Sequence, residues 1–423
     1  MINSCIPWIG EIPKEWSVCP LKTCIRWKSE KNHEDATVLS LYRDYGIVPK
    51  DSRDDNFNVT SLYTSGYKYV EVGDLVINKM KAWQGSIAVS DYEGIVSPAY
   101  HVCEITNERV YKRYLHYLLR NSSYLPEYMR LSTGLRIGQW DLGYDDFKNI
   151  KVILPKADEQ QRIVSFLDAE CNRIDKVIEQ TKASIEEYKK LKQSIITQAV
   201  TKGIRPDREM KDSGIEWIGE IPVDWNMSKV KYVAEFQPSC DTSKLKEDSE
   251  ISYTPMECIK NGYFINNTAL YGSISASLTP YNNGDIVIAK VTPCFENGNI
   301  AVMEALFSGC GFGSSELFVI RPHLILTRFL FYWFQNNLFI QRGCASMTGT
   351  GGLKRISPYF VKNCPVVLPK ESEQKKIVLY LDGKIKELDL LMAKKEEYLA
   401  ELESYKKSII FEHVTGKKEV PIC

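Results

Sequence analysis

LPKADEQQRIVSFLD occupies residues 154–168, and LPKESEQKKIVLYLD occupies residues 368–382. The two segments are near copies 214 positions apart, and the same offset joins SerIleIle at 194–196 to SerIleIle at 408–410. A shorter phrase, WIGEIPKEW at 8–16, recurs as WIGEIPVDW at 217–225. The chain is therefore a duplicated unit, and each copy has an opening phrase, a variable body and a closing segment.

Each closing segment carries the pattern of a coiled coil. In the first copy, apolar or small residues recur every seven positions in two rows offset by three: Val164, Cys171, Ile178, Ile185 and Ala199, then Leu167, Ile174, Thr181, Tyr188 and Ile195. Adding 214 gives the same register in the second copy, and Lys192 and Lys406 interrupt the same seam position. Two rows at this spacing predict a coiled-coil seam.

The length of these segments favours pairing between them. About 45 helical residues extend roughly 65 to 70 Å, which is too long for the core of one small domain. We expect the two helices to bury each other; the alternative is that each helix docks along its own body. The order of the repeated segments is circular, because the N-terminal segment continues the pattern with which the C-terminal segment ends. Closure of such a two-copy ring by a pseudo-twofold axis predicts an antiparallel pair of helices with one body at each end.

The predicted organisation has five parts: a first body at 1–153, a long helix at 154–203, a second body at 204–367, a second long helix at 368–416 and a tail at 417–423. GDLVINK at 73–79 and GDIVIAK at 284–290 each predict a Gly-Asp turn entering a buried strand. Aromatic-rich helices are expected near 109–121 and 324–341, with their rings in the core. The predicted fold class is α/β: two globular α/β domains separated by two long helices packed as an antiparallel coiled coil, in a pseudo-twofold internal repeat.

Composition restricts the function classes. The 423 residues are 44% hydrophobic, with 54 basic and 54 acidic side chains, so no global basic field indicates a nucleic-acid partner. Residues 1–153 carry 19 basic and 19 acidic groups, and residues 204–367 carry 15 and 16. The sequence shows no signal peptide and no run of 18 uncharged apolar residues, so we expect a cytoplasmic protein without a membrane partner. The 12 cysteines form no C-x-x-C pair and are expected to be reduced.

Polar loops follow the two Gly-Asp strands. They read NKMKAWQGS at 78–86 and AKVTPCFENGN at 289–299, and a second pair reads STGLRIGQWD at 132–141 and MTGTGGLKRIS at 347–357. Amide and long basic side chains on such loops suit contacts with base edges and phosphates, although a solvated hairpin tip is the alternative. The candidate DNA-binding residues are Lys79, Lys81, Trp83, Gln84, Arg136, Gln139, Lys290, Thr292, Asn297, Thr348, Lys354 and Arg355.

Catalytic interpretations find no support. GTGGLK at 349–354 lacks the spacing of a phosphate-binding loop, and the five histidines are isolated from one another. Pro293-Cys294 resembles the nucleophile dipeptide of a cytosine methyltransferase, but no Gly-rich cofactor strand precedes it. Asp74 with Lys79 is too little for a nuclease site. We therefore predict no catalytic residue, no cofactor and no metal in this chain.

The duplicated WIGEIP-x-x-W phrases, the LPK-x-x-EQ-x-x-I-V helices and the SII-x-x-x-VT endings resemble the specificity subunit of type I restriction-modification systems, over essentially the full chain. The resemblance implies two target-recognition domains, each reading half of a split site on double-stranded DNA. It implies that the paired helices fix the gap and dock modification (methyltransferase) subunits, two in number, which bring S-adenosylmethionine and methylate adenine. A separate restriction (motor and endonuclease) subunit would use ATP.

Two other classes remain as competitors. A self-associating coiled-coil scaffold with protein-binding bodies would have no DNA sequence preference, and the recurring polar loops would then have no purpose. A self-contained methyltransferase or nuclease would need a cofactor or metal motif.

The neutral charge of both bodies departs from a strongly basic DNA-binding surface, which indicates that modification subunits supply much of the phosphate contact.

Overall fold

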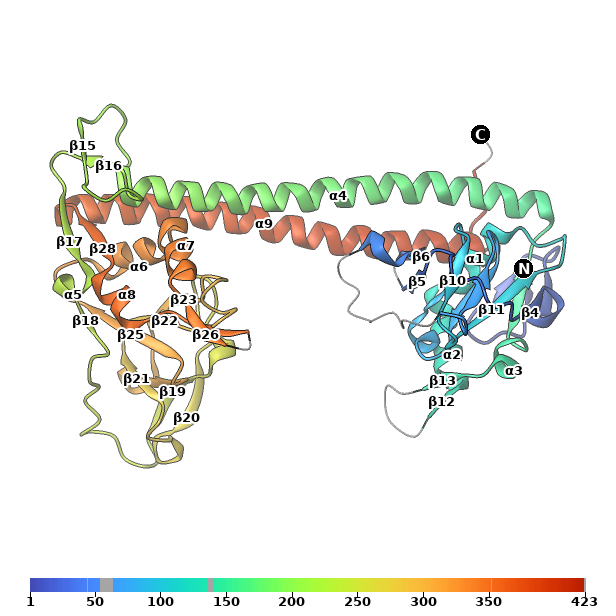
Figure 1. Cartoon of the computed structure of the whole chain (residues 1–423), viewed down its shortest axis with the longest axis horizontal. Helices are drawn as coiled ribbons and strands as arrows, with labels where there is room; N and C mark the ends of the chain where they lie inside the picture. The colour runs from blue at the N-terminus through green and yellow to red at the C-terminus, as the bar shows by residue number, and fades with distance from the viewer. Residues whose placement is uncertain (44, 54–63, 135–139, 351, 422–423) are drawn as a thin grey trace. The chain divides into compact units, whose positions relative to one another are not determined.

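The computed structural model describes residues 1–43, 45–53, 64–134, 140–350 and 352–421. The chain packs as two compact units, Met1–Thr181 with Glu397–Cys423 and Lys182–Glu396. Each unit holds one body and part of both long helices, α4 (Ala157–Lys202) and α9 (Glu371–Val414), which are green and red in Figure 1. No helix among the described residues has the length and apolar character to cross a membrane.

The first body consists of short strands and short helices. Its strands are β1 (Ile2–Asn3), β2 (Glu11–Ile12), β3 (Ser17–Pro20), β4 (Ile25–Lys28), β5 (Leu39–Tyr42), β6 (Gly46–Pro49), β7 (Lys68–Val70), β8 (Leu75–Asn78), β9 (Ile87–Val89), β10 (Gly94–Val96), β11 (Tyr100–Ile105), β12 (Ser132–Thr133), β13 (Asp141–Leu142) and β14 (Lys151–Leu154). Its α-helices are α1 (Lys112–Arg120), α2 (Leu125–Leu131) and α3 (Tyr144–Phe147), with 3-10 turns η1 (Leu21–Thr23), η2 (Lys50–Ser52), η3 (Ala82–Gln84) and η4 (Ser122–Tyr124).

A four-stranded antiparallel sheet with the order β4-β11-β8-β9 organises this body. All four residues of β8 are buried, and Val76 pairs with Val102 of β11 and with Ala88 of β9. Gly73 has a φ of +92°, which glycine adopts readily, so the Gly-Asp turn delivers the chain into the central strand as predicted. The strand at the start of the body, β3, pairs with β14 and so meets the segment that leads into α4.

The second body repeats this plan. Its strands are β15 (Met210–Asp212), β16 (Glu220–Pro222), β17 (Asn226–Lys229), β18 (Ala234–Phe236), β19 (Glu250–Thr254), β20 (Asn267–Leu270), β21 (Thr279–Asn282), β22 (Ile286–Ala289), β23 (Ile300–Val302), β24 (Cys310–Gly313), β25 (Leu317–Pro322), β26 (Thr348–Thr350), β27 (Leu353–Arg355) and β28 (Pro365–Leu368). Its helices are α5 (Val230–Val233), α6 (Thr327–Gln335), α7 (Asn337–Ala345) and α8 (Pro358–Asn363), with 3-10 turns η5 (Met256–Cys258), η6 (Tyr271–Ser273) and η7 (Phe307–Gly309).

The order β18-β25-β22-β23 matches the first sheet strand for strand, and β22 is again fully buried. A further sheet, β20-β19-β24-β21, is present in this body and includes one parallel pair, β19 with β24. The helix expected at 324–341 is divided: Asn336 has an extended backbone, and its side chain accepts a hydrogen bond from Phe339 N–H that starts α7. The α6 aromatics are buried, as predicted.

The two long helices run antiparallel within each unit (Figure 1). In the first unit, Lys406 Nζ lies 2.5 Å from Asp175 Oδ1, and the rings of Phe166 and His413 are 4.6 Å apart. In the second unit, Lys192 Nζ lies 2.6 Å from Asp389 Oδ1. The two ion pairs are equivalent under the 214-residue repeat. Each seam lysine thus pairs with the equivalent aspartate of the opposite copy. The predicted antiparallel coiled coil is confirmed in both units.

The first turns of each long helix also contact their own body. Gln160 donates to the carbonyls of Pro155 and Arg109 and accepts from Tyr111 N–H, and so joins α4 to the segment before α1. Gln374 does the same before α6, donating to Pro369 O and accepting from Leu326 N–H. The glutamine of the repeated EQ pair therefore attaches each body to its helix.

An aspartate two turns further on completes this attachment. Tyr117 hydroxyl donates to Asp168 Oδ1 at 2.5 Å, and Arg113 of the same helix lies beside that oxygen. In the second unit, the side chains of Arg328 and Tyr332 bind Asp382 in the same way. The aspartate that ends each repeated motif is therefore a second point at which the long helix is attached to its body, through the arginine and tyrosine of the aromatic-rich helix.

The repeated opening phrase covers a helix end. In the first unit, Trp16 lies beside Gly416, the residue that follows α9 closely. In the second unit, Trp225 lies beside Gly203 after α4, and its indole N–H donates to Glu373 Oε2 at 3.0 Å. Each WIGEIP phrase thus receives the carboxyl end of the helix from the other copy. This contact explains why the chain contains the phrase twice.

Candidate nucleic-acid interface

The two polar loops of the first body meet in space. The loop after β8 and the β12–β13 segment are joined by a hydrogen bond from Leu142 N–H to Lys79 O at 3.0 Å. Lys79 Nζ lies 2.7 Å from Asp141 Oδ2, and the Trp83 and Trp140 rings pack edge to face at 5.3 Å. Segments about 60 residues apart in the sequence therefore form one site.

Two of the predicted side chains in this site are free to reach a ligand. The loop folds as the 3-10 turn η3, with Ala82 buried and with Lys81 and Gln84 exposed. Trp83 is half-buried and its indole N–H donates to Met80 O at 3.2 Å, so it supports the loop. Lys79 is engaged with Asp141, while Arg136 and Gln139 lie outside the described residues.

The second body brings its two loops together by backbone contacts. The β26–β27 hairpin pairs with the loop after β22 through Thr292 N–H, which donates to Lys354 O at 2.9 Å. Thr292 Oγ1 donates to Gly352 O at 2.8 Å and accepts from Lys354 N–H at 3.0 Å. Thr292, predicted as a DNA contact, therefore fastens the hairpin to the loop. Asn297 and Thr348 are exposed at this site.

The charges of this site are unevenly engaged. Arg355 forms a bidentate pair with Glu316, through Nε at 2.9 Å and Nη2 at 2.8 Å. Lys290 Nζ donates to Ser315 O at 2.7 Å and lies 3.7 Å from Glu316. The hydrogen bonds from Arg355, helped by the Lys290 charge, lower the pKa of the Glu316 carboxyl. Lys354 is exposed, and no ion pair involves it among the described residues.

Glu316 was missed by the sequence reasoning, because nothing in its local pattern distinguishes it from a solvated loop carboxylate. The same holds for Asp141, which lies within a predicted loop but was not named. In each body a lysine at the end of the Gly-Asp strand, Lys79 or Lys290, is directed to such a carboxylate. The matching lysines are thus part of the framework that joins the two loops.

The aspartates of the Gly-Asp turns are structural. Asp74 accepts from Glu71 N–H at 2.9 Å and pairs with Lys28 of β4 at 3.2 Å; burial raises the pKa of this carboxyl. Asp285 accepts from Asn282 N–H at 2.7 Å and pairs with Arg321 of β25 at 2.8 Å. No group of three or more potential metal ligands is present among the described residues.

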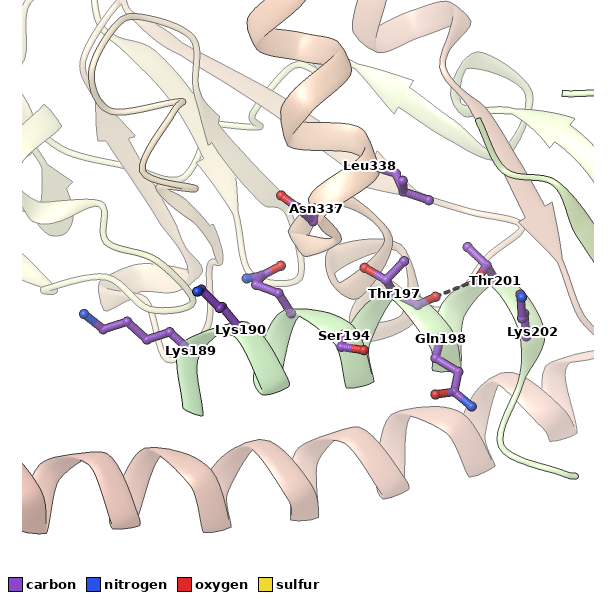
Figure 2. A pocket seen from close by; sticks show the side chains of 10 residues that line it. Lys189, Lys190, Ser194, Thr197, Gln198, Thr201, Lys202, Asn337 and Leu338 are labelled. Carbon is purple, nitrogen blue, oxygen red and sulfur yellow. Dashed lines mark hydrogen bonds between the residues drawn. The ribbon is translucent and has the colours of Figure 1, made fainter. Parts of the chain in front are cut away.

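A hollow of about 700 Å³ opens elsewhere in the second unit, between the carboxyl-terminal part of α4 and the start of α7 (Figure 2). Lys189, Lys190 and Lys202 line it together with polar α4 side chains, and Asn337 and Leu338 face them from α7. None of the predicted DNA-binding residues belongs to its lining. This hollow is therefore a surface of the helix, separate from the loop sites.

Two bodies of the same plan, each with a pair of polar loops and each packed on both long helices, define a duplicated two-domain protein. A family model for the type I restriction modification DNA specificity domain matches residues 17–187 and 222–400, one segment in each copy. The chain belongs to this family.

Two similar proteins are specificity subunits of type I restriction enzymes. The chain is 33% identical over 193 residues to the EcoAI specificity subunit of Escherichia coli, a match covering 44% of this chain and 32% of that protein. It is 25% identical over 432 residues to the MjaVIII specificity subunit of Methanocaldococcus jannaschii, covering 97% and 94%. Thus the chain spans about a third of the first relative but nearly the whole of the second.

Solved structures share the architecture. A chain from a study of complex assembly and conformational transition of the type I R-M system matches with a TM-score of 0.71 at 16% identity, over 96% of this chain and 100% of that one. The HsdS subunit from Thermoanaerobacter tengcongensis matches with a TM-score of 0.51 at 16% identity, over 96% and 98%. At this identity the likeness concerns the fold, and the predicted fold class is confirmed.

Proposed function

We propose that this chain is the non-catalytic DNA-reading subunit of a type I restriction-modification complex, and that each body reads one half of an asymmetric bipartite site on double-stranded DNA. The observation that carries the proposal is the pair of two-loop sites, which follow equivalent strands but present different side chains. Equal frames with different loops would read two different sequences in the same geometry.

The helix pair would fix the distance between the half-sites. The seam ion pairs Lys192–Asp389 and Lys406–Asp175 support a single antiparallel register, because a charged residue at a seam position disfavours slipped pairings. Half-sites read from the same face of DNA would lie about one helical turn apart, roughly 10 base pairs from centre to centre.

The partners would be two modification (methyltransferase) subunits docked on the helices, with restriction subunits joining through the complex, all in the cytoplasm. Since both bodies are neutral, the modification subunits would supply much of the phosphate contact. The lysine-lined hollow beside α7 is a candidate docking surface for acidic groups of such a subunit. Lys189→Glu with Lys190→Glu should abolish co-purification of the modification subunit; unchanged assembly would exclude the hollow.

The test of the function is a genome-wide map of methylated adenines. A methylation-free host would carry this chain with its neighbouring modification subunit, and the control host would lack only this chain. We expect a chain-dependent motif of two different short halves around a fixed gap that is not read. An assembled complex without a new motif would favour the competing coiled-coil scaffold, and binding to randomised DNA would then identify an inactive recognition allele.

Within this function the loops divide between the half-sites. Lys81→Ala and Gln84→Ala should damage recognition of one half only, and Lys290→Ala and Asn297→Ala should damage the other. Because Lys290 also supports Glu316, its effect should include weaker order in the second site. Equal damage to both halves by changes in one loop would mean that the loop is structural or contacts only the DNA backbone.

A further inference from the structure

Arg355 lies where the two loops of the second site meet, and its backbone is held from both sides. It pairs with Thr348 across the β26–β27 hairpin and forms an isolated bridge with Val291 on the neighbouring loop. The next residue, Ile356, is buried and donates its N–H to Lys290 O at 2.9 Å. The fold therefore fixes the backbone of Arg355, while 46% of its side chain stays exposed.

Glu316 holds the Arg355 guanidinium along one edge only. Nε donates to Oε2 at 2.9 Å and Nη2 donates to Oε1 at 2.8 Å. The Glu316 backbone is itself anchored, since its N–H donates to Ser314 Oγ at 3.2 Å and its carbonyl accepts from Lys290 N–H. A guanidinium has five N–H donors, so the Nη1 pair and one Nη2 hydrogen are left as a second fork.

This second fork is unengaged within the described part of the chain, where Arg355 donates only through Nε and Nη2. Arg321 offers a contrast in the same body. It binds Asp285 along the same edge, but its Nη1 donates to Ser239 O at 3.1 Å, and the Asp285 side chain is only 1% exposed. The guanidinium of Arg321 is thus bound on both of its edges within the fold, whereas Arg355 is bound on one edge and keeps N–H donors for a ligand on the other.

We propose, building on the function above, that Arg355 reads a guanine of the second half-site through O6 and N7 in the major groove, with Glu316 as its positioning residue. Guanine presents two acceptors side by side there, whereas adenine presents one acceptor and one donor. A two-stranded ribbon such as β26–β27 fits the width of that groove. Because Glu316 orients the guanidinium before DNA binds, less rotamer freedom is lost on binding.

The charges around the fork fit a DNA partner. Arg355 and Lys290 together carry two positive charges against the single negative charge of Glu316, so the group remains cationic. Lys354 precedes Arg355 on the strand and projects to the opposite face of the ribbon, because successive side chains alternate. The two neighbours therefore have separate tasks, in which Lys354 is available for phosphate and Arg355 for a base.

The experiment uses the full chain in its complex with the modification subunit, and reads the adenine methylation motif in a methylation-free host. Arg355→Ala and Arg355→Lys should each relax one G·C position of the second half-site by roughly 5- to 150-fold. Lysine keeps the charge but lacks the fork, so it should not restore the preference. Glu316→Gln should relax the same position more weakly, because the guanidinium loses its charged support.

The matched control is Arg130→Ala in the first body. Arg130 binds Glu127 through the same two nitrogens and is exposed, but the pair lies three residues apart on α2. This substitution should leave the second half-site unchanged. An unaltered first half-site in the Arg355 variants would show that they fold and assemble.

A second measurement does not depend on any variant folding. The purified wild-type complex is titrated with duplexes in which 7-deazaguanine replaces one guanine of the second half-site at a time, which removes only N7. One replacement should weaken binding at least several-fold, and the Arg355→Ala complex should be insensitive to that same replacement. Insensitivity of the wild-type complex to every replacement would overturn the proposal.

The outcomes separate this proposal from the function on which it rests. A bipartite motif with no G·C in its second half, or one whose guanines do not respond to Arg355, would overturn the guanine contact alone. Uniform weakening of the whole motif by Arg355→Ala would mean that Arg355 binds phosphate, and would also overturn it. No chain-dependent motif at all would overturn the proposed function together with the contact.

Discussion

Removing one heptad from each long helix changes the length of the coiled coil without changing its seam. Deleting residues 181–187 from α4 and 395–401 from α9 removes equivalent segments of the two copies. Both deletions lie between the two seam ion pairs, so Lys192–Asp389 and Lys406–Asp175 keep their partners. Both bodies also keep their attachments to the helix ends.

The expected shortening follows from helix geometry. Seven residues at 1.5 Å each shorten the coiled coil by about 10.5 Å, and a step of about 3.4 Å per base pair converts this into roughly 3 base pairs. Seven residues are almost two helical turns, so each body returns to nearly the same orientation about the helix. Three base pairs of DNA turn by roughly 100°, so the shorter gap should also be recognised more weakly.

Methylation mapping measures this prediction directly. The half-site sequences should stay the same while the unread gap shortens by about 3 base pairs, or the motif should disappear with the complex still assembled. Replacing the same residues by two other heptads of equal pattern is the length control and should preserve the original gap. If the double deletion left the gap unchanged, or changed the half-site sequences, the helix pair would not be a ruler.

Three further predictions concern single residues. Lys81→Ala should relax only the first half of the methylation motif and Asn297→Ala only the second, and a mixed pattern would contradict the assignment of one loop site to each body. Asp168→Asn and Asp382→Asn remove the charged acceptor that joins each body to its helix. Each should lower the free energy of unfolding, measured in urea, by about 1 to 3 kcal/mol. An unchanged free energy of unfolding would contradict this role of the carboxylate. Burial, with Arg120 and Arg113 nearby, lowers the pKa of His116 to about 3, so protonation of this histidine favours the unfolded chain. The free energy of unfolding should be at its full value above the ordinary histidine pKa and should fall by about 1 kcal/mol between pH 7 and pH 5.5. His116→Gln should reduce this fall, and an equal fall in both proteins would refute the role of His116.

Sequence alone determined the repeat, the helix pair and the buried strands, because these features depend on periodic or local patterns. The heptad rows of residues 164–199 repeat at an offset of 214, and hydrophobic seams of equal length and register have one simple way to be buried. The Gly-Asp turns are equally local, since only the short sequence around Gly73 and Gly284 is needed to enter a buried strand. The antiparallel direction followed from the ring-like order of the copies.

Tertiary structure decided which side chains meet, because these contacts join residues distant in sequence and carry no local periodicity. Composition nominated Lys79, Thr292 and Arg355 as equal candidates for DNA contact. Folding places a carboxylate beside Lys79 and uses Thr292 to fasten a hairpin, whereas Arg355 keeps one edge without a partner among the residues that the structure describes. The same donor groups thus differ in what they can bind, since a hydrogen bond made within the fold is unavailable to a ligand. Only the folded chain distinguishes them.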